Sequence, residues 1–431
     1  MSEAKKIIER ECTIVLELLT PLHIGTGEPD GYSDAGVVRD CNGLPGIPGT
    51  SIQGMLRAAV EEAAGEGIAK RIFGYSSLSN KGTGRGGRLS VSWGVIHDQN
   101  DTPVTGWLTS IQRDSDPVLR DAARPMLRDH VRLNDRGVAE SRGKFDELVV
   151  SAGHHFTVRL RFITSIENDI ADEKEHLKIE IGEDSDWHKL VSVLNAPRLR
   201  LGGKTRRGLG SFKINWKEAP EQATEDLPPP QLPEWDCSLS CKLTADTLWM
   251  LGGGSSSSAD SAPVRGTSIG WTGGGGRVQK GWIITGSSIK GALAHRTRFH
   301  ANRLGRNFAG LPQETDIETL MSDLFGTIAA NPKPGKVFID DLFIPESSLQ
   351  TAPIQNHVAI NPFTGGAKDS ALFNDQPLPP GGITIPLSIH MRGEADPKAR
   401  RAFEEALRDL KQGRLALGAH SGRGYGIFKS T

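Results

Sequence analysis

The chain has 431 residues, and its 51 lysine and arginine residues against 52 aspartate and glutamate residues give a formal net charge of −1. This length exceeds that of one ordinary hydrophobic core and predicts two or three domains. The balanced charge excludes a strongly basic or acidic protein, so only the distribution of the charges can indicate a nucleic-acid partner. Glycine accounts for 51 residues, well above its usual share of about 7%. Such a surplus without a collagen period predicts many tight turns, or backbone that approaches a ligand closely.

The four cysteines are too few and too scattered for a disulfide framework. Cys237 and Cys241 stand four positions apart, but no second pair completes a zinc site, and we expect both to be strand residues. Charges occur throughout residues 1–18, which argues against a signal peptide or a membrane span there. No other stretch is long and apolar enough to cross a bilayer. We therefore expect a cytoplasmic protein of a reducing compartment with no membrane partner.

The two halves of the sequence carry the same segments in the same order. Each half has an alternating apolar strand, a glycine turn, a polar loop with one aspartate, a capped helix, a Phe-Gly pair and a second strand. A His-Val block and a loop of the pattern Leu-x-Leu-Gly-x4-Arg-Gly-x-Gly-x-Phe follow. The matching pairs are 12–19 with 237–243, 21–27 with 247–254, Asp34 with Asp260, 47–57 with 284–296, Phe73 with Phe325, 88–96 with 336–344, 130–134 with 357–361, and 199–212 with 415–428. The chain is therefore a tandem duplication.

We place the first unit at residues 1–216, a proline-rich linker at 217–235 and the second unit at 236–431. Within each unit, residues 155–164 and 382–391 alternate as strands. Residues 396–412 have apolar side chains on one helical face, and residues 186–193 are their counterpart. The resulting β-α-β…β-α-β order predicts an α+β fold. Its two tandem ferredoxin-like, RNA-recognition-like domains would carry glycine-rich loops and a long hairpin excursion each.

The closing loop of the first half is basic and glycine-rich. Its cations are Arg198, Arg200, Lys204, Arg206, Arg207 and Lys213, with no acid among them. The glycines let the backbone come close, so that N–H groups and guanidinium groups can contact phosphates together. The second copy contains His420 and Arg423. The matching second-half helix begins near Lys290 and Arg296, where a helix N-terminus also favours an anion. The alternative is a solvated hairpin with basic side chains.

Two other kinds of site are weaker. Gly203-Lys204-Thr205 resembles the end of a P-loop, but residue 198 is arginine where that motif requires glycine. The run also leads into a strand instead of a helix, which argues against a nucleotide hydrolase. The histidines show no fixed partner or metal-ligand spacing, so we expect packed or surface side chains. These histidines are His23, His130, His154, His155, His357 and His420.

The blocks at 47–57 and the two closing loops resemble the RAMP superfamily of CRISPR-associated proteins. The excursion at 130–150, HVRLNDRGVAESRGKFDELVV, resembles the thumb hairpin of the Cas-seven-like backbone subunits of type III effectors. The double unit is similar to the fused subunits of type III-D-like systems. The resemblance implies an endoribonuclease subunit that coats a CRISPR guide RNA. It would cleave complementary single-stranded target RNA at regular intervals, beside bases that its thumbs displace.

The resemblance also implies a cofactor and partners. Cleavage would require Mg²⁺ or another divalent cation, with no organic cofactor. The partners would be a large polymerase/cyclase-like subunit, other backbone units and a small subunit. Catalytic and metal-binding roles fall on Asp34 and Asp260, with Asp30 and Asp246 as alternates. Because RNA supplies its own nucleophile in the 2′-hydroxyl, such a protein mainly holds that group in line, while a carboxylate recruits Mg²⁺ or orients water.

The same resemblance assigns RNA contacts and the thumbs. The thumb tips would be residues 135–144 and 362–371, with Phe145 and Phe373 packed at their bases. The RNA-binding residues would be Ser51, Gly54, Arg57, Arg132, Arg136, Lys204, Arg206, Arg207, Ser288, Lys290, Arg296, His420 and Arg423.

Two alternatives remain open. A loop aspartate is also common as a turn or cap residue, and a low-complexity run precedes Asp260, with a further insertion at 271–277. The protein would then be a non-catalytic, structural RNA-binding subunit of the same complex. The other alternative is a stand-alone nuclease that matures the guide, which no histidine–lysine constellation supports. In either case base pairing supplies the sequence specificity.

Overall fold

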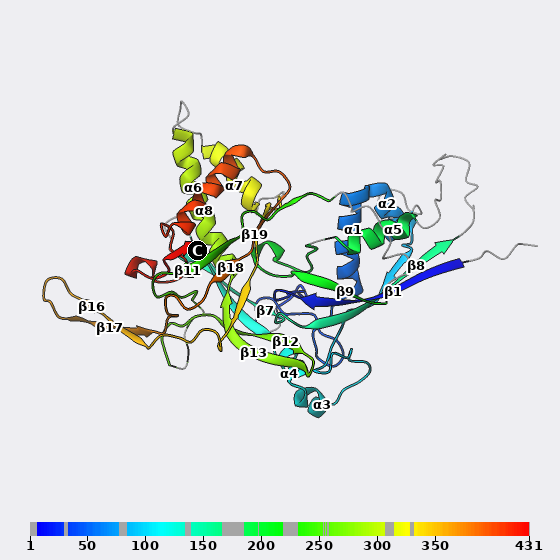
Figure 1. The fold of residues 1–431 in the computed structure, drawn as a ribbon, viewed down its shortest axis with the longest axis horizontal. Coiled ribbons are helices and arrows are strands. Elements are labelled where there is room, and N and C mark those ends of the chain that lie inside the picture. Colours follow the sequence, from blue (N-terminus) through cyan, green and yellow to red (C-terminus); the bar gives the residue numbers. More distant parts are fainter. Residues whose placement is uncertain are drawn as a thin grey trace, which may run out of the picture.

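The chain folds into two lobes joined through their sheets and loops (Figure 1). A computed structural model describes residues 7–29, 33–76, 84–133, 139–165, 185–196, 198–218, 232–252, 254, 256, 258–306, 314–327 and 332–430. Asp30, Arg136 and linker residues 219–231 lie outside this part. Buried apolar side chains form one large cluster drawn from residues 12–212 and another drawn from residues 239–428. In the described part of the chain, no helix is long and apolar enough to cross a membrane.

The first unit has a five-stranded antiparallel sheet in the order β4-β8-β1-β9, with β5 also paired to β8. These strands are β1 (Ile7–Leu18), β4 (Leu89–Val91), β5 (Val95–Ile96), β8 (His155–Ser165) and β9 (Phe212–Glu218). Alternate residues of β1, among them Ile14 and Leu16, are buried, because successive strand side chains point to opposite faces. The segment 88–96, predicted as one strand, forms the two short strands β4 and β5.

Helices pack on the sheet of the first unit, where α1 contacts both β4 and α5. The first-unit helices are α1 (Gly49–Ala64), α2 (Glu66–Phe73), α3 (Ser110–Ser115), α4 (Pro117–Ala122), α5 (Ser185–Leu194) and the 3₁₀ turn η1 (Thr205–Arg207). Two further short strands, β2 (Tyr75–Ser76) and β3 (Gly84–Arg85), pair with each other. Leu56 of α1 and Trp187 of α5 are buried in the core. Helix α5 thus confirms the helix predicted at 186–193.

The second unit repeats this strand order in a broken sheet. Strand β11 lies between β18 and β20, and β19 lies between β10 and β14. The strands are β10 (Trp235–Asp236), β11 (Cys241–Ala245), β14 (Val337–Ile339), β18 (Ile385–Leu387), β19 (Ile389–Arg392) and β20 (Phe428–Ser430). The single strand predicted at 237–243 is wrong. The carboxylate of Asp236 accepts hydrogen bonds from the N–H and hydroxyl of Ser238, and this local turn separates β10 from β11.

The helices of the second unit are α6 (Gly286–Arg306), α7 (Glu314–Phe325), α8 (Pro397–Lys411) and the 3₁₀ turn η2 (Ser421–Arg423). Helix α8 confirms the helix predicted at 396–412. The Asp396 carboxylate accepts bonds from the N–H groups of Lys398 and Ala399, and Pro397 stands at the first helical position. Both features favour a helix start at this point.

Each unit extends one two-stranded hairpin from its body. The first hairpin is β6 (Met126–Leu133) with β7 (Ala139–Val149), and the second is β16 (Gln355–Ile360) with β17 (Ala367–Asp375). The second projects far from its lobe in Figure 1. These hairpins occupy the two excursions expected from the sequence. Residues 134–138 at the tip of the first lie outside the described residues.

A third hairpin, which we call the arm, ties the second unit to the first. It consists of β12 (Arg265–Thr272) and β13 (Gly275–Ile284), and β13 also pairs with β15 (Leu342–Pro345). Ile269 N–H donates to Ala152 O at 2.9 Å, and Trp271 Nε1 donates to Gly153 O at 2.7 Å. The segment 271–277, treated above as an insertion, is thus the turn of a hairpin that contacts the first unit.

The units also meet at what we call the junction, where the first closing loop contacts the start of α6 and the turn between β14 and β15. Arg128 forms an ion pair with Asp341, and the side chains are only 3% and 1% exposed. The other Asp341 oxygen accepts the N–H of Gly286 at the start of α6, at 2.8 Å. Asp341 N–H donates to Gly208 O at 3.2 Å. One aspartate therefore joins both units and caps a helix.

The substitution Asp341→Ala should destabilise the protein strongly. It leaves the Arg128 guanidinium buried without a counter-charge and removes the acceptor at the start of α6. Removing one partner of a buried pair costs about 3–5 kcal/mol, which urea denaturation measures as free energy of unfolding. Asp114→Ala, at the half-exposed pair with Arg113, is the control and should change much less. Equal effects of both substitutions would contradict this role of Asp341.

Candidate functional site

Asp34 lies exposed where the opening loop meets the base of the first hairpin. Its N–H donates to Asp146 Oδ1 at 2.8 Å, and Asp146 N–H donates to Asp34 Oδ2 at 3.1 Å. Asp146 belongs to β7. Two carboxylates are thus held side by side through each other's backbone, at the foot of a projecting hairpin.

Asp260 occupies the matching place in the second unit. Its N–H donates to Asn374 Oδ1 at 2.9 Å, and Asn374 N–H donates to Asp260 Oδ2 at 2.9 Å. Asn374 belongs to β17, so the low-complexity run before Asp260 does not displace it from the position equivalent to Asp34. The alternate Asp246 instead forms an ion pair with Lys429, beside the last strand. The other alternate, Asp30, lies outside the described residues.

A buried carboxylate follows each of these hairpin positions. Glu147 is 1% exposed, and its Oε1 lies 2.8 Å from His130 Nε2, while Lys204 Nζ forms an ion pair with Oε2. Burial by itself raises the pKa of Glu147, but the hydrogen bonds from His130 and Lys204 outweigh it and lower that pKa to about 2. The closing loop is therefore anchored to the hairpin base by a charged contact.

The second unit places Asp375 at the corresponding buried position, with different partners. Asp375 Oδ2 lies 3.0 Å from His357 Nε2 and 3.7 Å from His420 Nε2, and the Tyr425 hydroxyl donates to Oδ1 at 3.3 Å. Burial, followed by the charge of Asp375, raises the pKa of Tyr425. The arrangement is repeated, but histidine and tyrosine replace the lysine contact.

One aromatic side chain stands at each hairpin base, Phe145 in the first unit and Phe373 in the second. Each ring stacks on the hairpin histidine with centroids 5.0 Å apart and an interplanar angle of 16°. Lys204 Nζ lies 5.1 Å from the Phe145 ring, and Arg423 Cζ lies 4.4 Å from the Phe373 ring. Cations at these distances are attracted to the ring faces. The closing loop thus contacts the hairpin base through an aromatic ring in both units.

The other proposed RNA-binding side chains have varied surroundings. Arg57 Nη1 donates to Gly74 O at 3.0 Å, Arg132 Nε pairs with Glu140 at 3.1 Å, and Arg296 Nε pairs with Asp409 at 2.6 Å. Arg206 and Lys290 are engaged in the junction, since Arg206 donates to Gly335 O and Lys290 donates to Arg206 O and Val337 O. Besides Arg132, which is itself exposed, five of the assigned residues are exposed or lie in the first turn of a helix. They are Ser51, Gly54, Arg207, Ser288 and Arg423.

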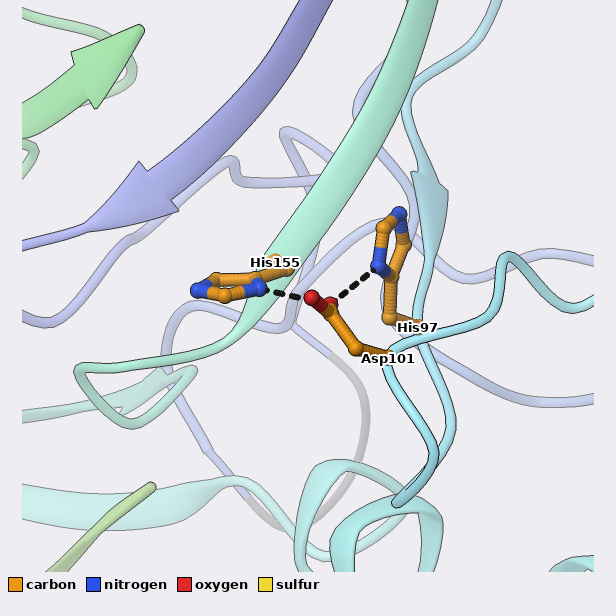
Figure 2. A group of neighbouring side chains, drawn as sticks. All are labelled: His97, Asp101 and His155. Carbon is orange, nitrogen blue, oxygen red and sulfur yellow. Dashed lines mark hydrogen bonds and ion pairs between the residues drawn. The ribbon is translucent and has the colours of Figure 1, made fainter. Parts of the chain in front are cut away.

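A cluster that the sequence prediction missed joins His97, Asp101 and His155 (Figure 2). Both histidines place Nδ1 2.7 Å from the same Asp101 oxygen, and the ring of His155 stacks on Trp271 of the arm at 4.4 Å. Burial lowers the pKa of His97. The Asp101 pKa is also lowered, because hydrogen bonds from both histidines outweigh the effect of burial.

The three ligand atoms of this cluster lie within 4.8 Å of one another, so a divalent ion could bind there. A search of the described residues for three or more histidine, cysteine, aspartate or glutamate side chains with metal-binding spacing yields this group. The 2.7 Å separations are those of hydrogen bonds, and the cluster also has a structural role because His155 holds the arm. The four-residue spacing of His97 and Asp101 is the one signal in the sequence that could have indicated a pair.

Two units define this chain as a duplicated α+β protein, each with an antiparallel sheet, a projecting hairpin and a glycine-rich closing loop. A family model described as the RAMP superfamily matches residues 15–213 and 265–429. The chain therefore belongs to the RAMP superfamily. The sequence matches no curated protein. Among solved structures, a chain of a type III-B Cmr-β complex determined by cryo-EM in the apo state aligns with 48% of this chain and 97% of its own length. The identity is 13% and the TM-score 0.34.

The substitution Glu147→Gln should remove a pH-dependent part of the stability. Since the folded pKa of Glu147 is depressed to about 2 from 4.5, its contribution is present above pH 4.5 and is lost as the pH falls toward 2. We expect the free energy of unfolding of the wild type to exceed that of the variant by about 3 kcal/mol near neutral pH. This difference should shrink as the pH falls from 5 to 3. Denaturation with urea at several pH values measures it. A difference that stays constant over this range would contradict the prediction.

Proposed function

We propose that the chain is a double-unit backbone subunit of a type III CRISPR ribonucleoprotein, composed of two ferredoxin-like units. It binds the guide RNA and cleaves complementary target RNA beside the base of each hairpin, in a metal-dependent way. Membership of the RAMP superfamily supports the assembly. The observation that carries the cleavage proposal is the duplicated hairpin base, where an exposed aspartate is fixed by reciprocal hydrogen bonds in both units.

The oxygen atoms at each hairpin base suit a hard divalent cation. Asp34 and Asp146 each use one carboxylate oxygen for the other's backbone N–H, and the second oxygen of each can bind a cation. Asp260 and Asn374 offer one carboxylate and one amide. Mg²⁺ binds through one or two carboxylates together with phosphate oxygens. The ion would neutralise charge on the scissile phosphate, while these residues hold the RNA backbone beside the hairpin.

The second hairpin has exposed apolar side chains of the kind that separate bases. On the second hairpin Phe363 is 95% exposed and Leu372 is 74% exposed, and Val358 and Ile360 are also exposed. Apolar side chains that insert between bases unstack a base step. An exposed apolar hairpin next to a fixed aspartate would place a displaced base and its phosphate near that carboxylate. The exposed Arg207 and Arg423 of the closing loops would contact RNA phosphates.

The partners follow from the same proposal. Guide RNA, target RNA and the other subunits of a type III effector would contact the chain, which fixes two backbone units per polypeptide. The second candidate function is a structural RNA-binding subunit without cleavage, and the exposed apolar hairpin fits that role equally well. The two functions differ in whether the aspartates at the hairpin bases are needed for cutting.

Cleavage by the reconstituted complex with Mg²⁺ should depend on both aspartates. We expect Asp34→Asn to abolish one specific cut and Asp260→Asn to abolish another, because each removes a charged metal ligand. Asparagine retains an acceptor for the neighbouring N–H, and Asn374 already stands at such a position, so assembly should be unchanged. Asp30→Asn and Asp246→Asn test the alternates, and Asp369→Asn on the second hairpin is the control. Cuts that persist in the double variant would support the structural function.

The first site should need less Mg²⁺ than the second, because it has two carboxylates where the second has one. The substitution Asp146→Asn gives the first site the composition of the second. We expect the Mg²⁺ concentration for half-maximal cleavage at the first cut to rise to that of the second cut, while the second cut is unchanged. Titration with Mg²⁺, following each product separately, measures both. An unchanged first cut would show that Asp146 does not bind the ion.

A further inference from the structure

At the junction, three basic side chains of the first unit meet two acidic side chains and a carbonyl group of the second, beside further contacts between Arg198 and His390 and between Arg392 and Glu62. Arg128 pairs with Asp341, and Arg200 pairs with Asp340 through two hydrogen bonds. Arg206 Nε donates to Gly335 O at 2.6 Å. All three arginines are at least half-buried. Close charge pairs of this kind determine which surfaces associate and exclude wrong partners.

The tandem repeat shows what stands at the same positions on the outward face of the second unit. Arg128 lies opposite Glu147 in the first hairpin, as Gln355 lies opposite Asp375 in the second. In the closing loops, which align residue by residue, Ala416 corresponds to Arg200 and Gly422 to Arg206. We call the surface of each unit that corresponds to the junction but points away from the other unit its outward face. On the second unit this is the surface around Gln355, Ala416 and Gly422, and it therefore lacks the three arginines that pair at the junction.

The outward face of the first unit lacks the acidic partners as well. A Cβ on Gly49 would overlap Val91 O, as one on Gly286 would overlap Ile339 O. These equivalent contacts align the two helix starts with the strands beneath them. The two residues after Ile339 are Asp340 and Asp341, and the two residues after Val91 are Ser92 and Trp93.

Both outward positions are open in the structure. Trp93 is 47% exposed, and its ring stands over Gly46. Gly424, the counterpart of Gly208, has no atom within 4 Å of an added Cβ, whereas Gly208 is blocked by the Asp341 carboxylate. The first unit also has only a short bridge, Arg39 with Pro45, where the second has the arm. The arginine–aspartate pairs and the arm thus occur once in the chain, whereas Arg198, which contacts His390 at the junction, has a counterpart in Arg414.

We propose that these arginine–aspartate pairs determine specificity at the junction: they join the two units of one chain, and their absence from both outward faces stops one chain from adding head to tail to another. A second copy docked in the same way would bring Gln355 and Ala416 against Trp93 and Ser92. This contact gains no charge pair, and the indole takes the place of a carboxylate that caps a helix. The two outward faces are therefore left for partners other than this chain.

The test restores the missing charges on separate chains. One full-length variant carries Ser92→Asp and Trp93→Asp, and the other carries Gln355→Arg and Ala416→Arg. We expect each variant and the wild type to be monomers by analytical ultracentrifugation without RNA. Mixed in equal amounts, the two variants should form a 1:1 complex at concentrations up to about 100 μM, since close interfacial charge pairs each strengthen association at least about tenfold.

A control with the opposite charge at the same two positions separates this effect from nonspecific association. Gln355→Glu with Ala416→Glu, mixed with the aspartate variant, should remain monomeric. Should Trp93→Asp fail to fold by circular dichroism, the single pair Ser92→Asp with Ala416→Arg gives the same comparison with a weaker complex. Head-to-tail association of the wild type would overturn the proposal. So would folded variants that stay monomeric when mixed, because the charges would then not determine the contact.

Discussion

In both units the backbone of the closing loop lies directly against the opening loop, and a glycine stands at each closest point. A Cβ on Gly202 would overlap His23 O, and a Cβ on Gly418 would overlap Met250 O. Both glycines have positive φ, which other residues adopt at a cost. The next residue but one, Lys204 or His420, also has positive φ and points its side chain at the buried carboxylate. The hairpin base can form only because the glycines permit this approach.

The two hairpin bases keep one geometry while their chemistry differs. In the first, a lysine ammonium and a histidine share the buried Glu147. In the second, His420 replaces the lysine, and burial followed by the charge of Arg423 lowers its pKa. The second base therefore has a weaker positive charge around Asp375 near neutral pH. Since the exposed aspartate beside each base is fixed by backbone hydrogen bonds, this difference changes the local field and leaves the aspartate's position unchanged.

Local signals in the sequence predicted most of the elements. The duplicated blocks gave the equivalence of the units, and Asp396 with Pro397 marked the start of α8. The equivalence of Asp34 and Asp260 also followed from the blocks, although the reciprocal bonds with the hairpin strands needed the fold. The break after β10 has no signal in the alternating pattern, because the side chain of Asp236 competes locally with strand pairing.

Contacts between the units could not be predicted from the sequence, for a different reason. The arm contains a glycine-rich turn that looks like an insertion, and its role appears only where Trp271 meets His155 of the first unit. Similarly, Asp341 is one of two adjacent aspartates after a strand, and no local pattern shows which buries its charge. Pairs such as Arg128 with Asp341 join residues more than two hundred positions apart, so neither partner indicates the other.

The junction also determines which basic side chains remain available to bind an anion such as an RNA phosphate. Burial, with Arg207 and Arg206 nearby, lowers the pKa of Lys290 to about 7, and its ammonium already donates to two carbonyl groups. Arg206 is likewise directed at Gly335 O. A closing loop that makes these contacts keeps Arg207 exposed for an anion, and the second loop keeps Arg423 although its Arg206 counterpart is Gly422. Each unit thus retains one exposed arginine at the same position, which is the arrangement expected if repeated phosphates meet repeated units.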